Sequence, residues 1–373
     1  MSQLVISGSG LYAPEETISN EELVLSFNTY VKQFNQQHKA KIDAGELQAL
    51  EPSSTEFIEK ASGVKRRHVI NKAGTLGVET MHPVLPERPD SELSIQAELA
   101  VKACKKAMHA ANKTAVDVDA VILGCSAMQR PYPAIAVEVQ SALGIDGFAF
   151  DLNVACSSAT FAIQTAADCV SRGHARAVLV VDPEICTGHL NFRDRNSHFI
   201  FGDACTAVVI ENQQYCTADK RFTVLGTKLQ TQFSTNIRNN FGFLNRAYQN
   251  KINAFEDKLF YQDGRKVFKE VVPLVVKHIA AHLATHCINP EKVKRFWLHQ
   301  ANSNMNRLIA TKLLGREPSE AEAPIILDEY ANTSSAGSVI AFHEYHQDLK
   351  AGDIGVLCSF GAGYSIGSVI LQR

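Results

Sequence analysis

The chain has 373 residues, of which 45% are hydrophobic and 20% charged, so it is long enough for one large or two medium globular cores. Its formal net charge of −2 gives no electrostatic reason to bind nucleic acid. Neither a basic, apolar leader nor an apolar run approaching the roughly 20 residues of a spanning helix is present, and we expect a cytoplasmic protein without a membrane span.

The predicted strands and helices occur in chain order as two copies of one unit. The first copy opens with a strand at Leu4–Gly10, continues with a helix and a strand at Asp119–Ala127, and closes at "GDACTAVVIE". The second opens at Phe222–Thr231, continues with a helix and a strand at Lys294–Asn302, and closes at "GAGYSIGSVIL". A further pair, "FAFDLNVACSSATFAIQTAADCVSRG" and "PIILDEYANTSSAGSVIAFHEYHQDLKAG", predicts a buried strand, a small polar junction and a helix in each copy.

The matching segments are offset by about half of the chain, which indicates one duplicated α/β unit and not a solenoid. We therefore expect two similar halves, 1–214 and 215–373, that pack about a pseudo-twofold axis. Two stretches, 28–54 and 71–92, match neither copy and are predicted to be surface insertions. The basic run 65–68 is predicted to be a solvated turn.

Nine cysteines are scattered along the chain without a CxxC pair or a Cys/His cluster at metal-ligand spacing. This pattern predicts no disulfide framework, and we expect neither a metal nor a cofactor. Most of these thiols are expected to be small core residues. Cys156 is the candidate nucleophile because it lies in "LNVACSSAT", where an apolar run meets small hydroxyl residues at the start of a helix.

Three residues lie at equivalent or neighbouring strand-to-helix junctions of the duplicated unit. Cys156 and Asn332 occupy the same place in the two copies, and His299 follows the strand "RFWL". A helix N-terminus could lower the pKa of Cys156 and activate its thiol. The alternatives are a structural cysteine, a structural histidine and an N-cap asparagine. The glycine-rich turn at 360–363 could stabilise an oxyanion with its backbone amides.

Five ordered segments resemble the active-site segments of β-ketoacyl-acyl-carrier-protein synthase III, a thiolase-fold condensing enzyme. They are "DLNVACSSATFAIQTA", "FIFGDACTAVVI", "WLHQANSNM", "ANTSSAGSV" and "SFGAGYSIGSVIL". The resemblance covers the chain apart from the two insertions. It implies an α/β, thiolase-like fold with duplicated αβαβα halves, and a homodimeric acyltransferase of fatty acid biosynthesis whose partners are acyl-CoA and acyl carrier protein.

The resemblance implies a catalytic triad of Cys156, His299 and Asn332. An acyl-CoA would acylate Cys156, with the backbone amides of Cys156 and Ala362 as the oxyanion hole. His299 and Asn332 would then bind the thioester carbonyl of malonyl-acyl carrier protein and stabilise the enolate that forms as CO₂ leaves. Attack of this carbanion on the acyl-cysteine would give the β-ketoacyl-acyl carrier protein.

The resemblance also implies substrate-binding positions, several of which depart from the family pattern. Phe57 stands where the family often has a tryptophan that stacks on the adenine of CoA, and Arg195 retains a nucleotide-contacting arginine. Ala61 and Asn304 replace two common arginines, which could be compensated by Arg265 or by the basic run 65–68. The other implied contacts are Phe268 at the pocket mouth, Asn302, Gly361, and Tyr132, which would cross the dimer interface to close the neighbouring acyl pocket.

These departures predict a primer longer than acetyl, of roughly medium length, bound mainly through acyl burial worth about 0.8 kcal/mol per CH₂. Other hypotheses keep the fold: a condensing enzyme of specialised metabolism, one that joins two fatty acyl-CoAs, or a thioester hydrolase. A non-catalytic acyl-binding protein is disfavoured because the Cys, His and Asn are all present. Relatives that abstract a proton need a carboxylate base; Glu138 and Glu184 are nearest in sequence, and both are expected at the surface or in ion pairs.

Overall fold

The computed structural model describes residues 3–239 and 258–373. Its main sheet consists of β1 (Leu4–Tyr12), β4 (Ala120–Gly124), β5 (Phe148–Leu152), β6 (Ala177–Ile185), β7 (Asp203–Asn212), β8 (Phe222–Thr231), β11 (Val293–Leu298), β12 (Ile354–Gly361) and β13 (Ser365–Gln372). The strand order is β11-β12-β13-β8-β1-β7-β6-β4-β5. The order β4-β6-β7-β1 therefore mirrors β11-β12-β13-β8, which confirms the predicted duplication.

The two half-sheets meet through a short antiparallel pairing of β1 with β8, at Val5–Thr223 and Ile6–Phe222. In each half, a parallel pair (β4 with β6, β11 with β12) is followed by antiparallel pairs (β6 with β7, β12 with β13). The expected division at 214/215 falls between the end of β7 and the start of β8.

One predicted strand is absent from the described structure. The segment "PIILD" was expected to match β5, but its last residues begin the short helix α10 (Leu327–Tyr330). The chain just before it accepts a backbone bond from Phe296 of β11 at Glu322 (2.7 Å), and the Ile326 amide of the segment donates to the Gln300 side chain (3.0 Å). Ile326 and Leu327 are buried by side-chain packing without strand pairing, so their apolar character does not distinguish a strand from a buried helix start.

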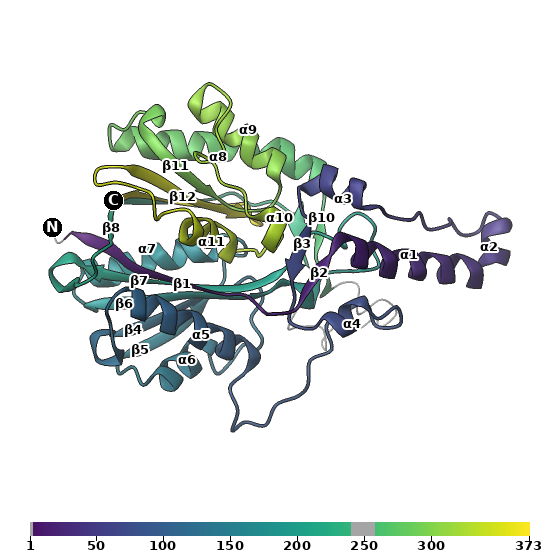
Figure 1. Ribbon diagram of the computed structural model, residues 1–373, viewed down its shortest axis with the longest axis horizontal. Coiled ribbons are helices and arrows are strands. Elements are labelled where there is room, and N and C mark those ends of the chain that lie inside the picture. The colour runs from purple at the N-terminus through teal and green to yellow at the C-terminus, as the bar shows by residue number, and fades with distance from the viewer. Residues whose placement is uncertain (1–2, 240–257) are drawn as a thin grey trace.

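The helices form three layers around the two half-sheets (Figure 1). The central layer contains α7 (Ser158–Ser171) and α11 (Ala336–Glu344), which contact strands of both halves. The outer layers contain α5 (Ile95–Ala110) and α6 (Ile135–Leu143) on one side, and α8 (Gly264–Thr285) and α9 (Ser303–Leu314) on the other. The central helices are rich in alanine, glycine and serine, and they are buried on most of their surface because a sheet packs on each side. This is the αβαβα architecture that the sequence predicted.

Both predicted insertions lie at the surface (Figure 1). The first contains most of α1 (Asn20–Gln37) and α2 (Lys39–Asp43), which project from the body, and an extended return segment. The side-chain amides of Asn28 and Asn35 each exchange two hydrogen bonds with the return segment's backbone, at Ser53 and Leu50. The second insertion begins with α4 (Lys72–Leu76) and continues as irregular chain. The remaining elements are β2 (Thr17–Ser19), α3 (Thr55–Ser62), β3 (Arg66–His68), β9 (Ile237–Arg238) and β10 (Tyr261–Gln262).

The basic run 65–68 is not a solvated turn, because it contains β3 and a fully buried arginine. The Arg67 guanidinium donates to the backbone carbonyls of Ile18 (3.1 Å) and Phe199 (3.2 Å) and to the Asn20 side chain (2.9 Å). Burial lowers the pKa of Arg67 to about 9. Arg67 is therefore a structural residue and cannot supply a missing substrate-binding cation.

Candidate active site

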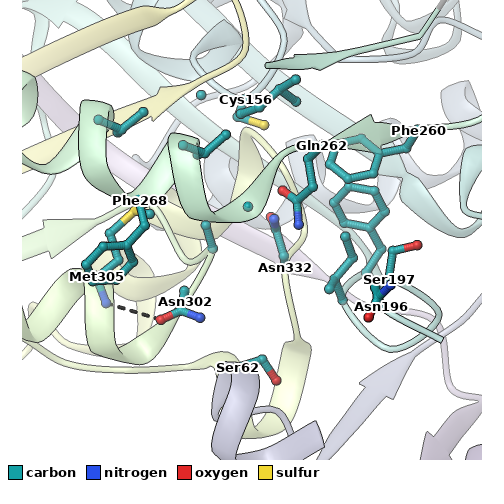
Figure 2. Close-up of a pocket in the computed structure, with 18 of the residues that line it drawn as sticks. Ser62, Cys156, Asn196, Ser197, Phe260, Gln262, Phe268, Asn302, Met305 and Asn332 are labelled. Atoms are coloured by element: carbon teal, nitrogen blue, oxygen red, sulfur yellow. Dashed lines mark hydrogen bonds between the residues drawn. The ribbon is translucent and has the colours of Figure 1, made fainter. Parts of the chain in front are cut away.

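The three residues of the expected triad line one cavity of about 710 Å³ between the two halves. Cys156 directly precedes the N-cap of α7, His299 directly follows β11, and Asn332 lies three residues before the N-cap of α11. Figure 2 shows the Cys156 and Asn332 side chains on the wall of this cavity, with Phe268 and Asn302 farther along it. The duplicated fold thus brings the two helix-start junctions together, as expected.

The backbone around Cys156 is held in a tight turn against the end of β12. Ala155, the preceding residue, has a φ of 48°, which non-glycine residues seldom adopt. A Cβ atom on Gly361 would lie 2.6 Å from the Cys156 Cβ and 2.9 Å from its Sγ, so only glycine leaves room for the thiol there. The hydroxyls of Ser157 and Ser365 are 2.9 Å apart and tie the turn after Gly361 to the start of α7.

Burial raises the pKa of Cys156 to about 11, contrary to the expectation that the helix N-terminus lowers it. Desolvation of the thiolate is the largest cause, and the charge of Glu184 acts in the same direction. The nearby Ser334 hydroxyl and the backbone amides of Ala362 and Cys156 oppose the increase, because they can stabilise the thiolate. These two amides are the expected oxyanion hole, and both approach the sulfur.

We predict that alkylation of Cys156 by iodoacetamide accelerates about tenfold per pH unit from pH 6 to 9.5 without levelling, because the thiolate is a minor species throughout that range. Peptide mapping by mass spectrometry at each pH measures the rate at this cysteine alone. N-acetylcysteine is the reference, since an unperturbed thiol levels near its pKa of about 8.5. A plateau at Cys156 below pH 8 would contradict the raised pKa.

His299 is buried beside the cavity and is neutral at physiological pH, because burial lowers its pKa to about 4. Its ring packs edge-on against Phe360, with 5.3 Å between the ring centroids. The nearby Ser334 backbone carbonyl acts in the opposite direction on the pKa. Nδ1 of His299 is buried and has no hydrogen-bond partner within the described part of the chain.

Asn332 is fixed by its backbone and by its side-chain oxygen. Its N–H donates to the Ile200 carbonyl (2.9 Å), and its own carbonyl accepts from the Gly202 N–H (3.1 Å). Oδ1 accepts from the Ser334 N–H (2.9 Å), which leaves the amide nitrogen as the group available to a substrate in the cavity. The N-cap of α11 is Ser335, so the alternative of Asn332 as an N-cap is wrong.

Four of the implied substrate-binding residues line the cavity: Arg265, Phe268, Asn302 and Gly361. The Asn302 amide is engaged within the protein, since its oxygen caps α9 and its nitrogen donates to the Ala61 carbonyl (2.7 Å). Asn304 is exposed, and its N–H is one of the two that Asn302 caps.

Phe57, Arg195 and Tyr132 do not line this cavity among the described residues. The Arg195 guanidinium lies 4.2 Å over the Phe57 ring, and its Nε donates to the Pro52 carbonyl in the first insertion (2.7 Å). Arg195 therefore covers one face of the Phe57 ring. Tyr132 is 81% exposed on another part of the surface.

The two carboxylates considered as bases lie outside the cavity lining. Glu138 forms an ion pair with Arg130 (2.6 Å), as expected. Glu184 was expected at the surface or in an ion pair, but it is fully buried and has no cationic partner within the described residues. Asp194 is the one carboxylate that the described cavity lining contains, and it accepts a hydrogen bond from the Ser197 hydroxyl (2.6 Å) in its own turn.

Comparisons with known proteins decide the family. The models for 3-oxoacyl-[acyl-carrier-protein (ACP)] synthase III and for its C-terminal part match residues 150–232 and 283–373. The chain is 61% identical over 348 residues to a β-ketodecanoyl-[acyl-carrier-protein] synthase from Pseudomonas aeruginosa, covering 93% of this chain and 99% of the relative. The chain belongs to the synthase III family.

Other members extend this likeness over the whole chain. A β-ketoacyl-[acyl-carrier-protein] synthase III from Bordetella petrii is 30% identical over 379 residues, covering 100% of this chain and 98% of the relative. The crystal structure of 3-oxoacyl-(acyl carrier protein) synthase III from Pseudomonas aeruginosa superposes with a TM-score of 0.76 at 23% identity, covering 99% and 98% of the two chains. This likeness confirms the thiolase-like fold, and the family is one of condensing acyltransferases.

Ser334 is a site residue that sequence reasoning missed. It has a φ of 49°, its hydroxyl lies where it can stabilise the Cys156 thiolate, and its carbonyl lies near the His299 ring. Its hydroxyl is buried and has no hydrogen-bond partner within the described residues. The run of small hydroxyl residues after Asn332 was the available signal, but only the folded turn places one of them beside both Cys156 and His299.

Within residues 3–239 and 258–373, no group of three or more His, Cys, Asp or Glu side chains is arranged to hold a metal ion. No helix in the same ranges combines the length and apolar character needed to cross a membrane.

Proposed function

We propose that this synthase III condenses a medium-chain acyl-CoA primer with malonyl-acyl carrier protein, with loss of CO₂, to give a β-ketoacyl-acyl carrier protein. The observation that carries the proposal is the convergence of one thiol, one neutral imidazole and one free amide nitrogen on a single cavity, at Cys156, His299 and Asn332. Two backbone amides approach the same sulfur.

In the first half-reaction, the Cys156 sulfur attacks the primer's thioester carbonyl. The bond from the carbonyl carbon to Sγ forms, the bond to the CoA sulfur breaks, and the thiol proton leaves with CoA. The amides of Cys156 and Ala362 would stabilise the oxyanion of the tetrahedral intermediate. Because the thiol is protonated at rest, deprotonation must accompany the attack.

In the second half-reaction, the imidazole of His299 and the amide nitrogen of Asn332 would donate hydrogen bonds to the thioester carbonyl of the malonyl group. The bond to the carboxylate breaks, CO₂ leaves, and the electron pair forms an enolate that the two donors stabilise. The carbanion carbon then bonds to the acyl carbon while the bond to Sγ breaks, and the departing Cys156 thiolate takes up one proton from water to regenerate the thiol. A neutral imidazole suits this role, since no proton has to be transferred.

The cavity favours decarboxylation over proton abstraction as the source of the carbanion. Asp194 is the lining carboxylate of the described residues, and a serine in its own turn already binds it. Glu138 pairs with Arg130 outside the cavity. Decarboxylation needs no general base, whereas a proton-abstracting condensation needs one, generally a carboxylate in this group of enzymes.

A homodimer is the second part of the proposal, with Tyr132 reaching the partner's acyl pocket. An exposed apolar face supports it: Tyr132 is 81% exposed, Val137 44% and Phe148 37%, and the last two lie on α6 and on β5, which pack together. The strand β5 is also an edge strand of the main sheet in the described part of the chain. Because the proposed substrates are a CoA thioester and a carrier protein, we propose a cytoplasmic location.

The expected primer has about eight carbons. The 61% identical relative is named for a ten-carbon β-ketoacyl product, and each decarboxylative condensation adds two carbons to its primer. The aromatic residues Phe199, Phe201, Phe260 and Phe268 line the cavity and would bury such a chain.

We predict that the specificity constant rises from acetyl-CoA to octanoyl-CoA and falls at longer chains. The gain comes from acyl burial, about 0.8 kcal/mol per CH₂. Initial rates with acetyl- to dodecanoyl-CoA and saturating malonyl-acyl carrier protein measure it. Tyr132→Ala should move the optimum to longer chains. Tyr345→Ala is the control, because Tyr345 is a tyrosine of the other half that is 41% exposed, and it should leave the optimum unchanged. A steady fall from acetyl-CoA would contradict the prediction.

A further inference from the structure

We infer that Glu184 is a positioning residue for the reaction proposed above, because one buried carboxylate binds the Asn332 turn directly and is linked through Ser126 and Asn153 to the turn of Cys156. Glu184 lies near the end of β6 in the first half, and its side chain is fully buried. It lines neither the cavity nor any surface, so its role must act through other residues.

The Glu184 carboxylate accepts hydrogen bonds from two serines on different segments. From Ser335, at the start of α11, the N–H (3.2 Å) and the hydroxyl (2.6 Å) both donate to Oε1. From Ser126, just after β4, the N–H donates to Oε1 (3.0 Å) and the hydroxyl to Oε2 (2.6 Å). Charge-assisted bonds of this length are the strong ones, so the carboxylate joins the second half's α11 to two strand ends of the first half.

The Ser335 side of this contact fixes the turn of Asn332. Ser335 is the N-cap of α11, and Ser334 before it has a φ of 49°. The Ser334 N–H binds Oδ1 of Asn332, which sets the direction of the Asn332 amide. Residues with such backbone angles persist only when their surroundings hold them, and Glu184 binds the next residue through two bonds.

On the Ser126 side, a chain of hydrogen bonds connects Glu184 to the turn of the nucleophile. The Ser126 carbonyl accepts from the Asn153 side-chain nitrogen (3.0 Å), and the Asn153 side-chain oxygen accepts from the Ala155 N–H (2.9 Å). Ala155 has a φ of 48° and directly precedes Cys156. Glu184 thus holds the nucleophile's turn through one serine and one asparagine, and holds the Asn332 turn directly.

Burying the Glu184 carboxylate without a cationic partner among the described residues costs free energy of folding, and this cost supports a functional reason for its presence. A buried charge without a cationic partner is destabilising unless hydrogen bonds compensate it. After burial, the negative charge of Glu184 is also a cause of the raised pKa of the Cys156 thiol. The charge therefore opposes thiolate formation, while its hydrogen bonds order the Asn332 turn that the malonyl step requires.

The test separates the two half-reactions in four full-length variants. Glu184→Ala should lower malonyl-dependent CO₂ release on the order of 10²-fold, as misplacement by about 1 Å can, and should lower self-acylation of Cys156 much less. Glu184→Gln can keep the Oε1 contacts to Ser335 without the charge. It should restore most CO₂ release and move the pH profile of Cys156 alkylation to lower pH.

If Glu184→Ala does not fold, Ser335→Ala provides a second test, because it leaves the carboxylate in place. It should also lower CO₂ release, whereas Ser338→Ala, which removes another buried hydrogen-bonded serine of α11, should not. Equal loss of both half-reactions in Glu184→Ala, no rescue by glutamine, or identical behaviour of the two serine variants would overturn the inference. Failure of the proposed function would instead appear in the wild-type enzyme, as absence of CO₂ release.

Discussion

Replacing Cys156 with alanine is expected to abolish condensation, with a loss on the order of 10⁴–10⁶-fold in kcat, because the acyl-enzyme can no longer form. The sulfur faces the cavity, and its removal leaves only a small void beside Gly361. We therefore expect a loss of about 1 kcal/mol or less in the free energy of unfolding. Steady-state rates, intact-protein mass spectrometry after addition of octanoyl-CoA, and thermal unfolding measure the three quantities.

Cys169→Ala is the matched control, since Cys169 is a partly exposed thiol on α7, the helix that Cys156 precedes. It should keep both acylation and turnover. Cys125, Cys186 and Cys205 are buried away from the cavity, and burial raises their pKa well above the usual range. A stable thioester on any cysteine other than Cys156 in the wild type would contradict the assignment.

His299→Ala and Asn332→Ala are expected to retain self-acylation and each to lose malonyl decarboxylation by about 10²–10³-fold. One lost donor to a developing oxyanion typically costs about 2.7–4 kcal/mol of barrier. The sulfur's own stabilising groups are the Ser334 hydroxyl and two backbone amides, which neither substitution removes. Single-turnover acylation with octanoyl-CoA and CO₂ release from malonyl-acyl carrier protein report the two steps separately.

His343→Ala serves as the control for removal of a histidine, because His343 lies on α11 and binds Ser9 (2.9 Å) away from the cavity. It should leave both steps unchanged. If His299→Ala or Asn332→Ala prevented acylation as completely as Cys156→Ala, the division of the triad between two half-reactions would be wrong.

The sequence could predict the features that depend on local patterns and that occur in both halves of the chain. Strand and helix periodicity repeats in both halves, so the two similar α/β halves and the meeting of the Cys156 and Asn332 junctions follow from the duplication, whereas the αβαβα layering was implied by the family resemblance. The pattern failed at residues 324–328, because a short apolar run does not distinguish a strand from a buried helix start, and this run leads into α10.

Properties that depend on burial could not be predicted in this way. A helix start favours a thiolate at Cys156, but the depth of the turn between two halves decides its pKa. Arg67 and Glu184 have charges that are usually solvated, and only the tertiary structure surrounds them with hydrogen-bonding groups. The contact of Arg195 with Phe57 and Pro52 likewise joins segments far apart in the sequence.

The most direct test of the proposed reaction is mass spectrometry of the carrier protein after incubation of the wild-type enzyme with octanoyl-CoA and malonyl-acyl carrier protein. The account predicts a carrier bearing a β-ketodecanoyl group, with one CO₂ and one free CoA released per product. Release of free octanoic acid and CoA from an unchanged malonyl carrier would instead identify a thioester hydrolase, and would contradict the proposed condensation.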